Sequence, residues 1–241
     1  MIAWLKPGTP FPDVDTALDS PNGLLAASEH LEVEQLLAAY RQGIFPWYAE
    51  GDPVLWWCPD PRMVLVTSEF RVSRSLRKTL RALRSDERRQ LRLDTDFEGV
   101  MRACAKPRRG QDGTWISEEI VAAYGKLAQR DLAHSIELWQ DGQLVGGAYG
   151  VSLGRMFYGE SMFSRVRDAS KIALAALVAV LLRERVPMID CQQKTPHLAS
   201  LGAREISRRE FCAHLQRVID EAPVPWQAYR GVPLNRFLDV D

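Results

Sequence analysis

The sequence predicts an α+β protein, in which a small N-terminal domain (residues 1–62) precedes a larger domain (residues 63–241) with a mixed, largely antiparallel sheet. Alternating strand patterns flank Asp141-Gly142, and this dipeptide favours a tight hairpin turn. The segment 168–182 is apolar nearly all round, which predicts a buried helix. A proline-rich stretch that ends at Arg62 marks the boundary between the domains.

The N-terminal domain is expected to contain one helix. Residues 1–30 are rich in Pro, Gly, Asp and Ser and predict extended or turning chain. From Leu31 to Tyr40 the apolar spacing is helical, and Gly43 suits a left-handed cap after the helix. A short strand at residues 63–66 then leads into a basic helix.

The larger domain is expected to run from helices into a meander of strands, a buried helix, one more strand and a last helix. Capping patterns predict four helix starts: Thr95-x-x-Glu98 (for a helix reaching Cys104), Ser117, Asp168 and Ser207-x-x-Glu210. The expected strands cover residues 135–139, 144–151, 155–162 and 188–192.

Composition excludes several classes of protein. The 31 basic residues balance the 31 acidic ones, which argues against a general DNA coater. The four Cys and four His lack ligand spacing, so neither a metal nor a cofactor is expected. Walker A, G-x-G-x-x-G and G-x-S-x-G motifs are absent. The longest apolar run, 172–182, is too short to span a membrane, and no secretion signal is recognisable, so a cytoplasmic protein with reduced thiols is expected.

A basic stripe follows the predicted strand at 63–66. Eight Arg and one Lys lie between residues 71 and 92, and Arg74, Arg77, Lys78 and Arg81 share one helical face. Such a stripe can follow a phosphate backbone. A solvated helix face is the plainer alternative and stays open.

Tryptophans supply a second indication of a nucleic-acid partner. Trp47, Trp56, Trp57 and Trp115 lie in or beside predicted loops rather than inside periodic elements. An exposed indole can stack on an unpaired base, which contributes about 1–3 kcal/mol per base. Burial in the core is an equally weighted alternative, because Trp is largely buried on average.

An acid and an amide lie two residues apart on the predicted strand 188–192. Asp190 and Gln192 are therefore expected to leave the same face of the strand. The segment Gly159-Glu-Ser-Met-Phe-Ser164 adds a carboxylate, Glu160, among apolar side chains. Together these residues suggest a transferase active site.

Seven blocks in order, between about Pro21 and about Phe211, resemble the leucyl/phenylalanyl-tRNA–protein transferase family. They are Tyr40-Arg-Gln-Gly-Ile-Phe-Pro-Trp47, Leu55-Trp-Trp-Cys-Pro-Asp-Pro-Arg62, Gly113-Thr-Trp-Ile116, His134-Ser-Ile-Glu137, Leu144-Val-Gly-Gly147, Gly159-Glu-Ser-Met-Phe-Ser164 and Ile189-Asp-Cys-Gln192. Where the family usually has Gly-Gly-Asp, this chain has Ser28-Glu29-His30, a difference that can alter a helix cap.

The resemblance implies transfer of Leu or Phe, with Met as a further candidate, from aminoacyl-tRNA to the N-terminal Arg or Lys of a protein. The modified protein would then be degraded under the N-end rule. It also implies a larger domain of the GNAT acyltransferase type. A coenzyme A loop of the Q/R-x-x-G-x-G/A kind is missing from the sequence, which fits an acyl donor that is a tRNA ester.

An aminoacyl ester is already activated, so the enzyme needs to hold ester and amine together and accept a proton. We expect Gln192 to orient the amine and Asp190 to act as general base or electrostatic partner. Glu160 is expected to hold the acceptor amine or its cationic side chain. The alternatives are structural: Asp190 bonds loop amides, and Glu160 pairs with a structural Arg.

The resemblance also assigns binding residues. An apolar pocket for the donor side chain is expected from Met156, Phe157, Met162, Leu174, Leu177 and Ile189, although each taken singly also suits the core. Adenosine and tRNA binding is assigned to Trp47, Trp115, Tyr124, Tyr40 and the four basic residues of the stripe. The expected partners are aminoacyl-tRNA and an acceptor protein, and the chain is expected to be a monomer. The rival functions are tRNA-dependent transfer to another amine, coenzyme A-dependent acylation, and tRNA binding without activity.

Overall fold

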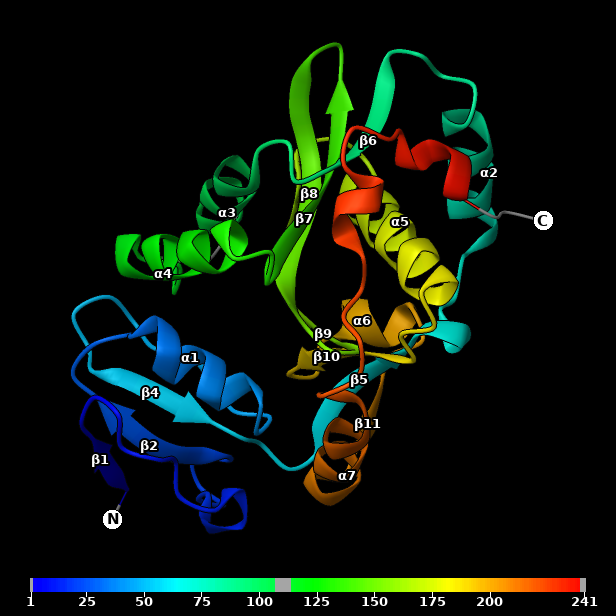
Figure 1. Cartoon of the computed structure of the whole chain (residues 1–241). Helices are drawn as coiled ribbons and strands as arrows, with labels where there is room; N and C mark the ends of the chain where they lie inside the picture. The colour runs from blue at the N-terminus through cyan, green and yellow to red at the C-terminus, as the bar shows by residue number, and fades with distance from the viewer. Residues whose placement is uncertain (1, 107–113, 239–241) are drawn as a thin grey trace.

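The computed structural model describes residues 2–106 and 114–238, and it contains two sheets (Figure 1). The smaller sheet has the strand order β1 (Ala3–Leu5), β2 (Leu24–Ser28), β4 (Val54–Trp57), β3 (Phe45–Pro46). Helix α1 (Val33–Tyr40) joins β2 to β3. Residues 107–113, which include Gly113 of the block Gly113–Ile116, lie outside the described residues.

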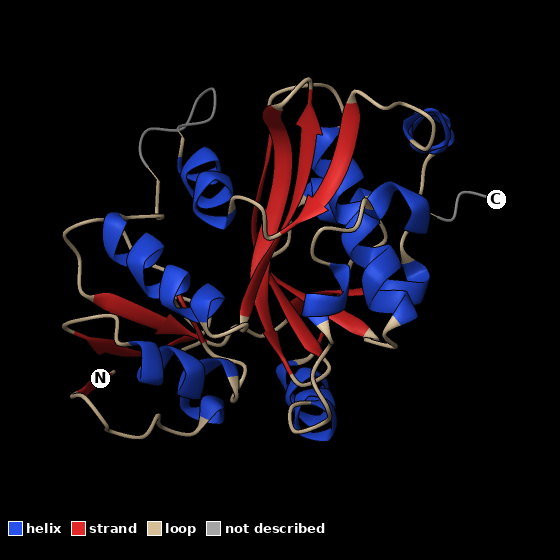
Figure 2. Ribbon diagram, turned by 45° about the horizontal axis from the view of Figure 1, so that its top comes forward, coloured by secondary structure: helices blue, strands red, loops and turns tan. Residues whose placement is uncertain are grey.

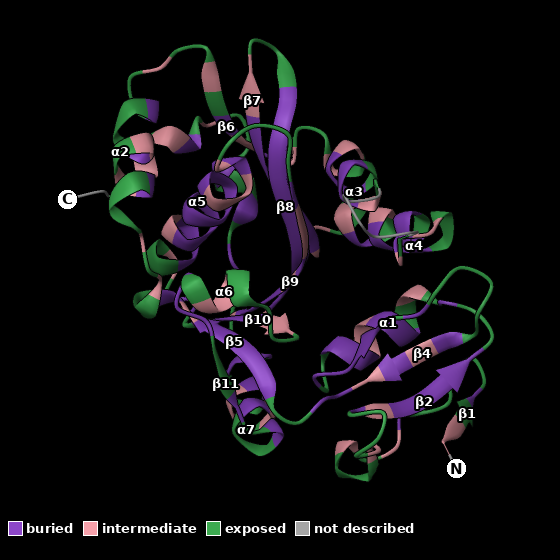
Figure 3. Cartoon of the chain, turned by 180° about the vertical axis from the view of Figure 1, so that it is seen from behind, coloured by how far each residue is buried: buried purple, intermediate pink, exposed green. Residues whose placement is uncertain are grey.

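The larger sheet has seven strands, in the order β11 (Arg204–Ile206), β5 (Arg62–Val66), β10 (Met188–Gln192), β9 (Met156–Ser164), β8 (Gln143–Leu153), β7 (Ala133–Gln140), β6 (Arg89–Leu93). Strands β9 and β10 are parallel, and the other neighbours are antiparallel. The predicted mixed, largely antiparallel sheet is therefore confirmed. Its middle strands are coloured as mostly buried in Figure 3.

Helices cover both faces of this sheet (Figure 2). They are α2 (Arg74–Leu83), α3 (Phe97–Ala105), α4 (Glu118–Gln129), α5 (Ala169–Arg183), α6 (Pro196–Ser200) and α7 (Arg208–Val218), with short 3-10 helices at Val14–Thr16, Thr67–Glu69, Trp226–Tyr229 and Leu234–Phe237. Helix α5 is buried around most of its circumference, as its sequence predicts. No helix in the described part of the chain has the length and apolar character that crossing a bilayer requires.

Two adjacent glycines let helices approach β8 from opposite faces. A Cβ on Gly146 would lie 2.4 Å from the Cβ of Ala169 in α5, and one on Gly147 would lie 3.3 Å from a methyl of Val100 in α3. Neighbouring strand residues point to opposite faces, so the pair lies between the two layers of helices. Close packing of α5 on β8 therefore depends on the absence of a side chain at Gly146.

We expect Gly146→Ala to lower the free energy of unfolding by about 1–3 kcal/mol, because the rigid Ala169 methyl cannot move aside. Gly125→Ala is the matched control, since a Cβ there has nothing within 4 Å and the site is inside α4. The control is expected to gain about 0.5–1 kcal/mol. Urea denaturation of both variants measures the difference, and equal stabilities would contradict the packing argument.

Several predicted boundaries are confirmed and three details are wrong. Strand β10 has the predicted range, and Ser117 and Ser207 cap α4 and α7 with their side chains. Helix α3 is capped by Asp96, whose Oδ1 accepts from Gly99 N at 2.9 Å, and not by Thr95. Helix α1 begins at Val33, two residues later than predicted. Asp168 precedes α5 with φ 60° and forms no capping bond, because its carboxylate pairs with Lys171.

Strands β9 and β10 separate soon after they pair. Their register includes only Ile189 with Phe157 and Asp190 with Tyr158, while β9 continues along β8 to Ser164. Strand β10 then bulges against β5 between Asp190 and Gln192, and Gln192 has a left-handed backbone with φ 62°. The sheet thus opens at its centre.

Candidate functional site

A cavity of about 1220 Å³ lies at this opening, between the two sheets. Its wall combines segments that are far apart in sequence. They are residues 45–50, 55 and 57 of the small sheet region, 104 and 106 at the end of α3, 114 and 115 before α4, 148, 149 and 159–162 of β8 and β9, 174 and 177 of α5, and 189, 191–193, 195, 197 and 198 around β10 and α6. The wall mixes aromatic, aliphatic and a few polar groups, which is typical of a small-molecule or chain-end binding site.

Glu160 is the buried carboxylate of this wall. Its Oε1 accepts hydrogen bonds from the Tyr40 hydroxyl at 2.7 Å and from Gln192 Nε2 at 2.9 Å. Its Oε2 accepts from the Tyr124 hydroxyl at 3.2 Å, and the two tyrosine hydroxyls also bond to each other. Three neutral groups from α1, α4 and β10 therefore hold the carboxylate in one orientation.

The surroundings of Glu160 favour its neutral form. Burial raises the pKa of Glu160 to about 7, and the bonds from Tyr40, Tyr124 and Gln192 only partly oppose the shift. Burial and the charge of Glu160 raise the pKa values of Tyr40 and Tyr124, so both phenols stay protonated donors. Glu160 therefore titrates near neutral pH, which suits a group that takes up and releases a proton there.

Asp190 lies beneath the cavity rather than on its wall. It is 0% exposed and forms a two-pronged ion pair with Arg62, through Nε to Oδ1 at 2.8 Å and Nη2 to Oδ2 at 2.6 Å. The guanidinium of Arg62 lies between the rings of Phe45 and Phe211, 4.8 and 4.5 Å from their centroids. Burial lowers the pKa of Arg62, but the charge of Asp190 outweighs this effect and raises it, so the guanidinium stays charged.

The same carboxylate fixes Gln192. Asp190 Oδ1 accepts from the backbone N–H of Gln192 at 2.9 Å and so holds the left-handed residue at the bulge. The expectation that strict alternation places Asp190 and Gln192 side by side is wrong, because the bulge interrupts the alternation between them. Gln192 faces the cavity, whereas Asp190 supports it through Arg62 and the Gln192 backbone.

Four of the six residues expected to form the apolar pocket line the cavity: Met162, Leu174, Leu177 and Ile189. The other two do not. Met156 is fully buried in the core, and Phe157 packs against the ring of Trp226 with centroids 5.8 Å apart. Placing these two in the pocket was wrong, because the cavity wall begins two residues after Phe157 in β9, at Gly159.

The aromatic residues assigned to adenosine separate into two groups. Trp47, 42% exposed, and the half-buried Trp115 both line the cavity and can offer a ring face to a ligand. Tyr124 and Tyr40 are fully buried and donate to Glu160, so stacking by their rings is ruled out in this structure. Their position corrects the sequence-based assignment from adenosine binding to support of the carboxylate.

The basic stripe lies on α2, outside the cavity wall. Arg74, Lys78 and Arg81 are exposed and Arg77 is partly exposed. Just before α2, Arg71 N donates to Leu201 O at 2.9 Å, which ties this segment to the loop after α6. His197 and Leu198 of α6 line the cavity. A nucleic acid that ended in the cavity could thus pass α6 and reach the stripe.

Sequence reasoning missed several residues of the site. Arg62 was named only as the last residue of a motif block and was given no role, although its ion pair with Asp190 anchors β10 to β5. Phe45, Gln193, Thr195 and His197 were not singled out, yet all four line the cavity. The available signal was their position, since Phe45 lies inside the block Tyr40–Trp47 and the other three follow the block Ile189–Gln192. Nothing in the sequence shows that these segments converge.

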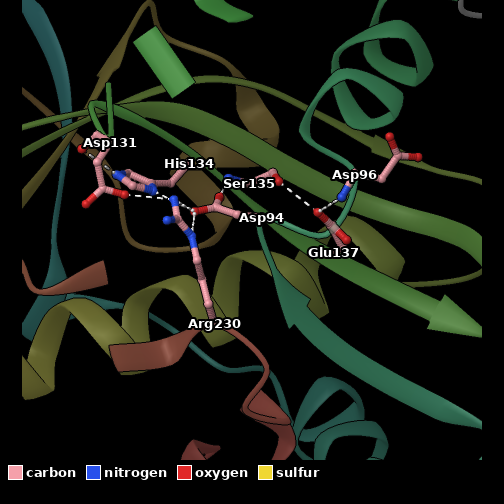
Figure 4. A network of polar contacts seen from close by, with 7 residues as sticks. All are labelled: Asp94, Asp96, Asp131, His134, Ser135, Glu137 and Arg230. Carbon is pink, nitrogen blue, oxygen red and sulfur yellow. Dashed lines mark hydrogen bonds and ion pairs between the residues drawn. The ribbon is translucent and has the colours of Figure 1, made fainter. Parts of the chain in front are cut away.

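The block His134–Glu137 belongs to a separate polar network (Figure 4). His134 Nδ1 contacts Asp94 Oδ2 at 2.9 Å, and Arg230 donates to Asp94 and Asp131 at 3.0 and 2.7 Å. Asp94, Asp131 and His134 are close enough to hold a metal ion, but the guanidinium already lies between the two carboxylates. This network ties the C-terminal segment to β6 and β7.

Glu137 completes that network at its other end. Its Oε1 accepts from Ser135 Oγ at 2.9 Å and Asp96 N at 2.7 Å, and its Oε2 accepts from Trp139 Nε1 at 2.7 Å. Burial raises the pKa of Glu137 despite these bonds. The carboxylate therefore joins β7 to the start of α3, away from the cavity wall.

The sequence matches identify the family. A family model described as "Leucyl/phenylalanyl-tRNA protein transferase" matches residues 64–216, and one described as the N-terminal domain of that protein matches residues 29–60. A relative named leucyl/phenylalanyl-tRNA–protein transferase from Burkholderia pseudomallei is 59% identical over 231 residues, which cover 94% of this chain and 91% of the relative. One of the same name from Paraburkholderia phymatum is 56% identical over 236 residues, 96% of each chain.

Solved structures give weaker likenesses. A GCN5-related N-acetyltransferase-like protein from Streptococcus suis matches with a TM-score of 0.36 and 14% identity, over 76% of this chain and 67% of that one. L-PGS from Bacillus licheniformis matches with a TM-score of 0.36 and 12% identity, over 73% and 57%. These structural likenesses carry no argument, and the family assignment rests on the sequence matches. Because these cover most of the chain at well over 30% identity, the chain belongs to the leucyl/phenylalanyl-tRNA–protein transferase family.

Proposed function

We propose that this chain transfers Leu or Phe, and also Met, from aminoacyl-tRNA to the N-terminal Arg or Lys of an acceptor protein. The observation that carries the proposal is a buried carboxylate that titrates near neutral pH, at the opening of the sheet, beside an apolar wall. Family membership supplies the donor and acceptor classes. Degradation of the product under the N-end rule, a cytoplasmic location, a monomeric state and a domain division at residue 62 are parts of the same proposal.

The reaction needs one proton acceptor. The α-amine of the acceptor has a pKa of about 8 when unperturbed, so it must lose a proton before it attacks. Its nitrogen forms a bond to the ester carbonyl carbon, the ester C–O bond breaks, and a proton passes to the ribose oxygen, which leaves as a hydroxyl of the released tRNA. Glu160 in its carboxylate form binds the ammonium group and takes the proton, while Gln192 orients the amine.

The donor side chain binds against Met162, Leu174, Leu177 and Ile189. These side chains carry no charge, and the flexible thioether of Met162 can adapt to either Leu or Phe. Trp47 and Trp115 flank the terminal adenosine of the tRNA. Asp190 acts as a positioning residue through Arg62 and the backbone of Gln192, rather than as the base.

Helix α2 holds the acceptor stem through phosphate contacts that do not read the sequence. We expect Arg74→Gln with Lys78→Gln to weaken binding of every aminoacyl-tRNA and to reduce the slope of log Kd against log salt by about 1–2. Arg217→Gln, at an exposed site on α7, is the matched control. Filter binding at several salt concentrations measures both, and an unchanged slope would show that the stripe is only a solvated face.

The test of the reaction mixes the purified chain with radiolabelled Leu-tRNA and one of two peptides that differ only in their first residue, Arg or Ala. Label on the Arg peptide alone supports the proposal. Label on neither peptide, with tRNA still bound, would contradict it and favour a binding protein or a different amine. Label on both would contradict the proposed acceptor class.

A further inference from the structure

The small sheet extends the cavity wall outwards. In the register of this sheet Trp4 of β1 lies opposite Ala27 of β2, and Ala27 lies opposite Leu55 of β4. Residues opposite each other share a face, so Trp4 and Leu55 are on the same side of the sheet. Leu55 and Trp57 line the cavity, and Trp47 contacts Trp57 with ring centroids 5.7 Å apart. We call Trp4, Leu55 and Trp57 the aromatic row, which Trp47 borders on the cavity side.

The outer end of the aromatic row is open. Trp4 is 58% exposed, the highest value among the large apolar side chains of the described residues, while Leu55 and Trp57 are half-buried. Neighbouring strands lie about 4.8 Å apart, so Trp4 is about 10 Å beyond Leu55. An extended chain covers that distance in about three residues. A polypeptide whose first residue was in the cavity could reach Trp4.

The charge of this part of the chain favours a basic occupant. Residues 1–62 contain three Lys or Arg against nine Asp or Glu, whereas residues 63–241 contain 28 against 22. Glu50 lies on the cavity rim, and the exposed Asp52 follows in the turn before β4. Acidic groups repel the phosphates of RNA and attract cationic side chains. The basic α2 and the acidic small sheet therefore suit two different substrates.

We propose that the aromatic row binds the acceptor polypeptide from its second residue onwards, as an extended and preferably basic segment. The proposal rests on the proposed function and names where its protein substrate lies. The acceptor leaves the cavity over β4, β2 and β1, and the tRNA leaves past α6 towards α2. The arrangement requires an acceptor whose N-terminal segment is unfolded, because a folded chain could not follow the strands.

The test compares acceptor peptides of two lengths, an Arg-Ala amide and a peptide of about ten residues that begins Arg-Ala and carries Lys at later positions. We expect Trp4→Ala to raise KM for the long peptide about five-fold, the effect of losing an aromatic contact of ordinary strength. KM for the short peptide and for Leu-tRNA is expected to stay unchanged. Leu182→Ala removes another exposed apolar side chain, 47% exposed on α5, and is the matched control.

A second variant tests the charge. Glu50→Gln with Asp52→Asn should raise KM for the long basic peptide at low salt and leave it unchanged for a long neutral peptide. A crosslinking peptide with a photoreactive phenylalanine at its fourth or fifth residue should label the aromatic row of the native chain, which gives a readout that does not depend on how well a variant folds.

The outcomes separate this proposal from the proposed function. Transfer to the short peptide by every variant supports the proposed transfer reaction. Equal KM values of Trp4→Ala and the native chain for the long peptide would contradict binding of the acceptor by the aromatic row. A raised KM for Leu-tRNA in Trp4→Ala would assign the aromatic row to RNA and also overturn it. Dimers of the chain that Trp4→Ala abolishes, with no effect on the peptide, would show that a second copy covers the row. If the native chain transferred to neither peptide, the proposed transfer reaction itself would be contradicted.

Discussion

Glu160→Gln is expected to lower the single-turnover rate of transfer at pH 8 by about 100-fold or more, because the amide cannot accept the proton of the acceptor amine. The amide keeps the size of the side chain and can still bond to Tyr40 and Tyr124. Binding of aminoacyl-tRNA is expected to stay the same. Glu34→Gln, which removes an exposed carboxylate paired with Arg130, is the matched control and should react at the native rate.

The same variant is expected to be more stable than the native chain above pH 7. Burial raises the pKa of Glu160 from 4.5 to about 7, so the folded state binds the proton more tightly than the unfolded state does. The stability that this provides is complete below pH 4.5 and is lost as the pH rises through 7. A side chain that stays neutral avoids the loss, which is up to about 3 kcal/mol. Lower activity with higher stability would mark Glu160 as a functional residue, whereas lower stability at pH 8 would indicate a structural role.

Asp190→Asn is expected to lower the free energy of unfolding by about 3–5 kcal/mol, because it leaves the buried guanidinium of Arg62 without a counter-charge. The change keeps the size of the side chain, so loss of charge is the cause. Urea denaturation at pH 7 measures it. Glu34→Gln again serves as control, since its ion pair is exposed, and the two variants should differ clearly in the midpoint of denaturation.

A double variant separates folding from positioning. Arg62→Met with Asp190→Leu replaces the ion pair by apolar groups of similar size and is expected to recover most of the stability. It does not restore an acceptor for the backbone N–H of Gln192, so the bulge loses its support and the transfer rate stays low. Full recovery of the rate together with the stability would show that Asp190 has no part in placing Gln192.

Much of the fold could be predicted from local patterns. The hairpin at Asp141-Gly142, the buried helix α5 and the strand β10 each have a strong signal within a short stretch of chain. Strand β6 has no such signal, because Arg89-Gln-Leu-Arg-Leu93 is dominated by its charges. It becomes a strand by pairing with β7, a contact between segments more than 40 residues apart. The start of α3 could not be predicted to the residue, because Thr95 and Asp96 are adjacent and either side chain could cap the helix; Asp96 does so.

The site could be predicted as a set of residues but not as a geometry. Glu160 and Gln192 were singled out and meet in the cavity. The support of Glu160 by Tyr40 and Tyr124 required the packing of α1 against α4, which no local pattern shows. The role of Asp190 depended on the position of Arg62, 128 residues earlier in the chain. A β-bulge at Gln192 also leaves no reliable trace in a five-residue strand.

The most direct test of the account is the pH dependence of the single-turnover rate, measured with saturating Leu-tRNA and a peptide that begins with Arg. The native chain should lose activity as the pH falls through about 7, where Glu160 takes up a proton. Glu160→Gln should lose this step and follow only the acceptor amine, whose pKa is about 8. Superimposable profiles, with rates within a few-fold of each other, would contradict the assignment of Glu160 as the group that receives the acceptor amine.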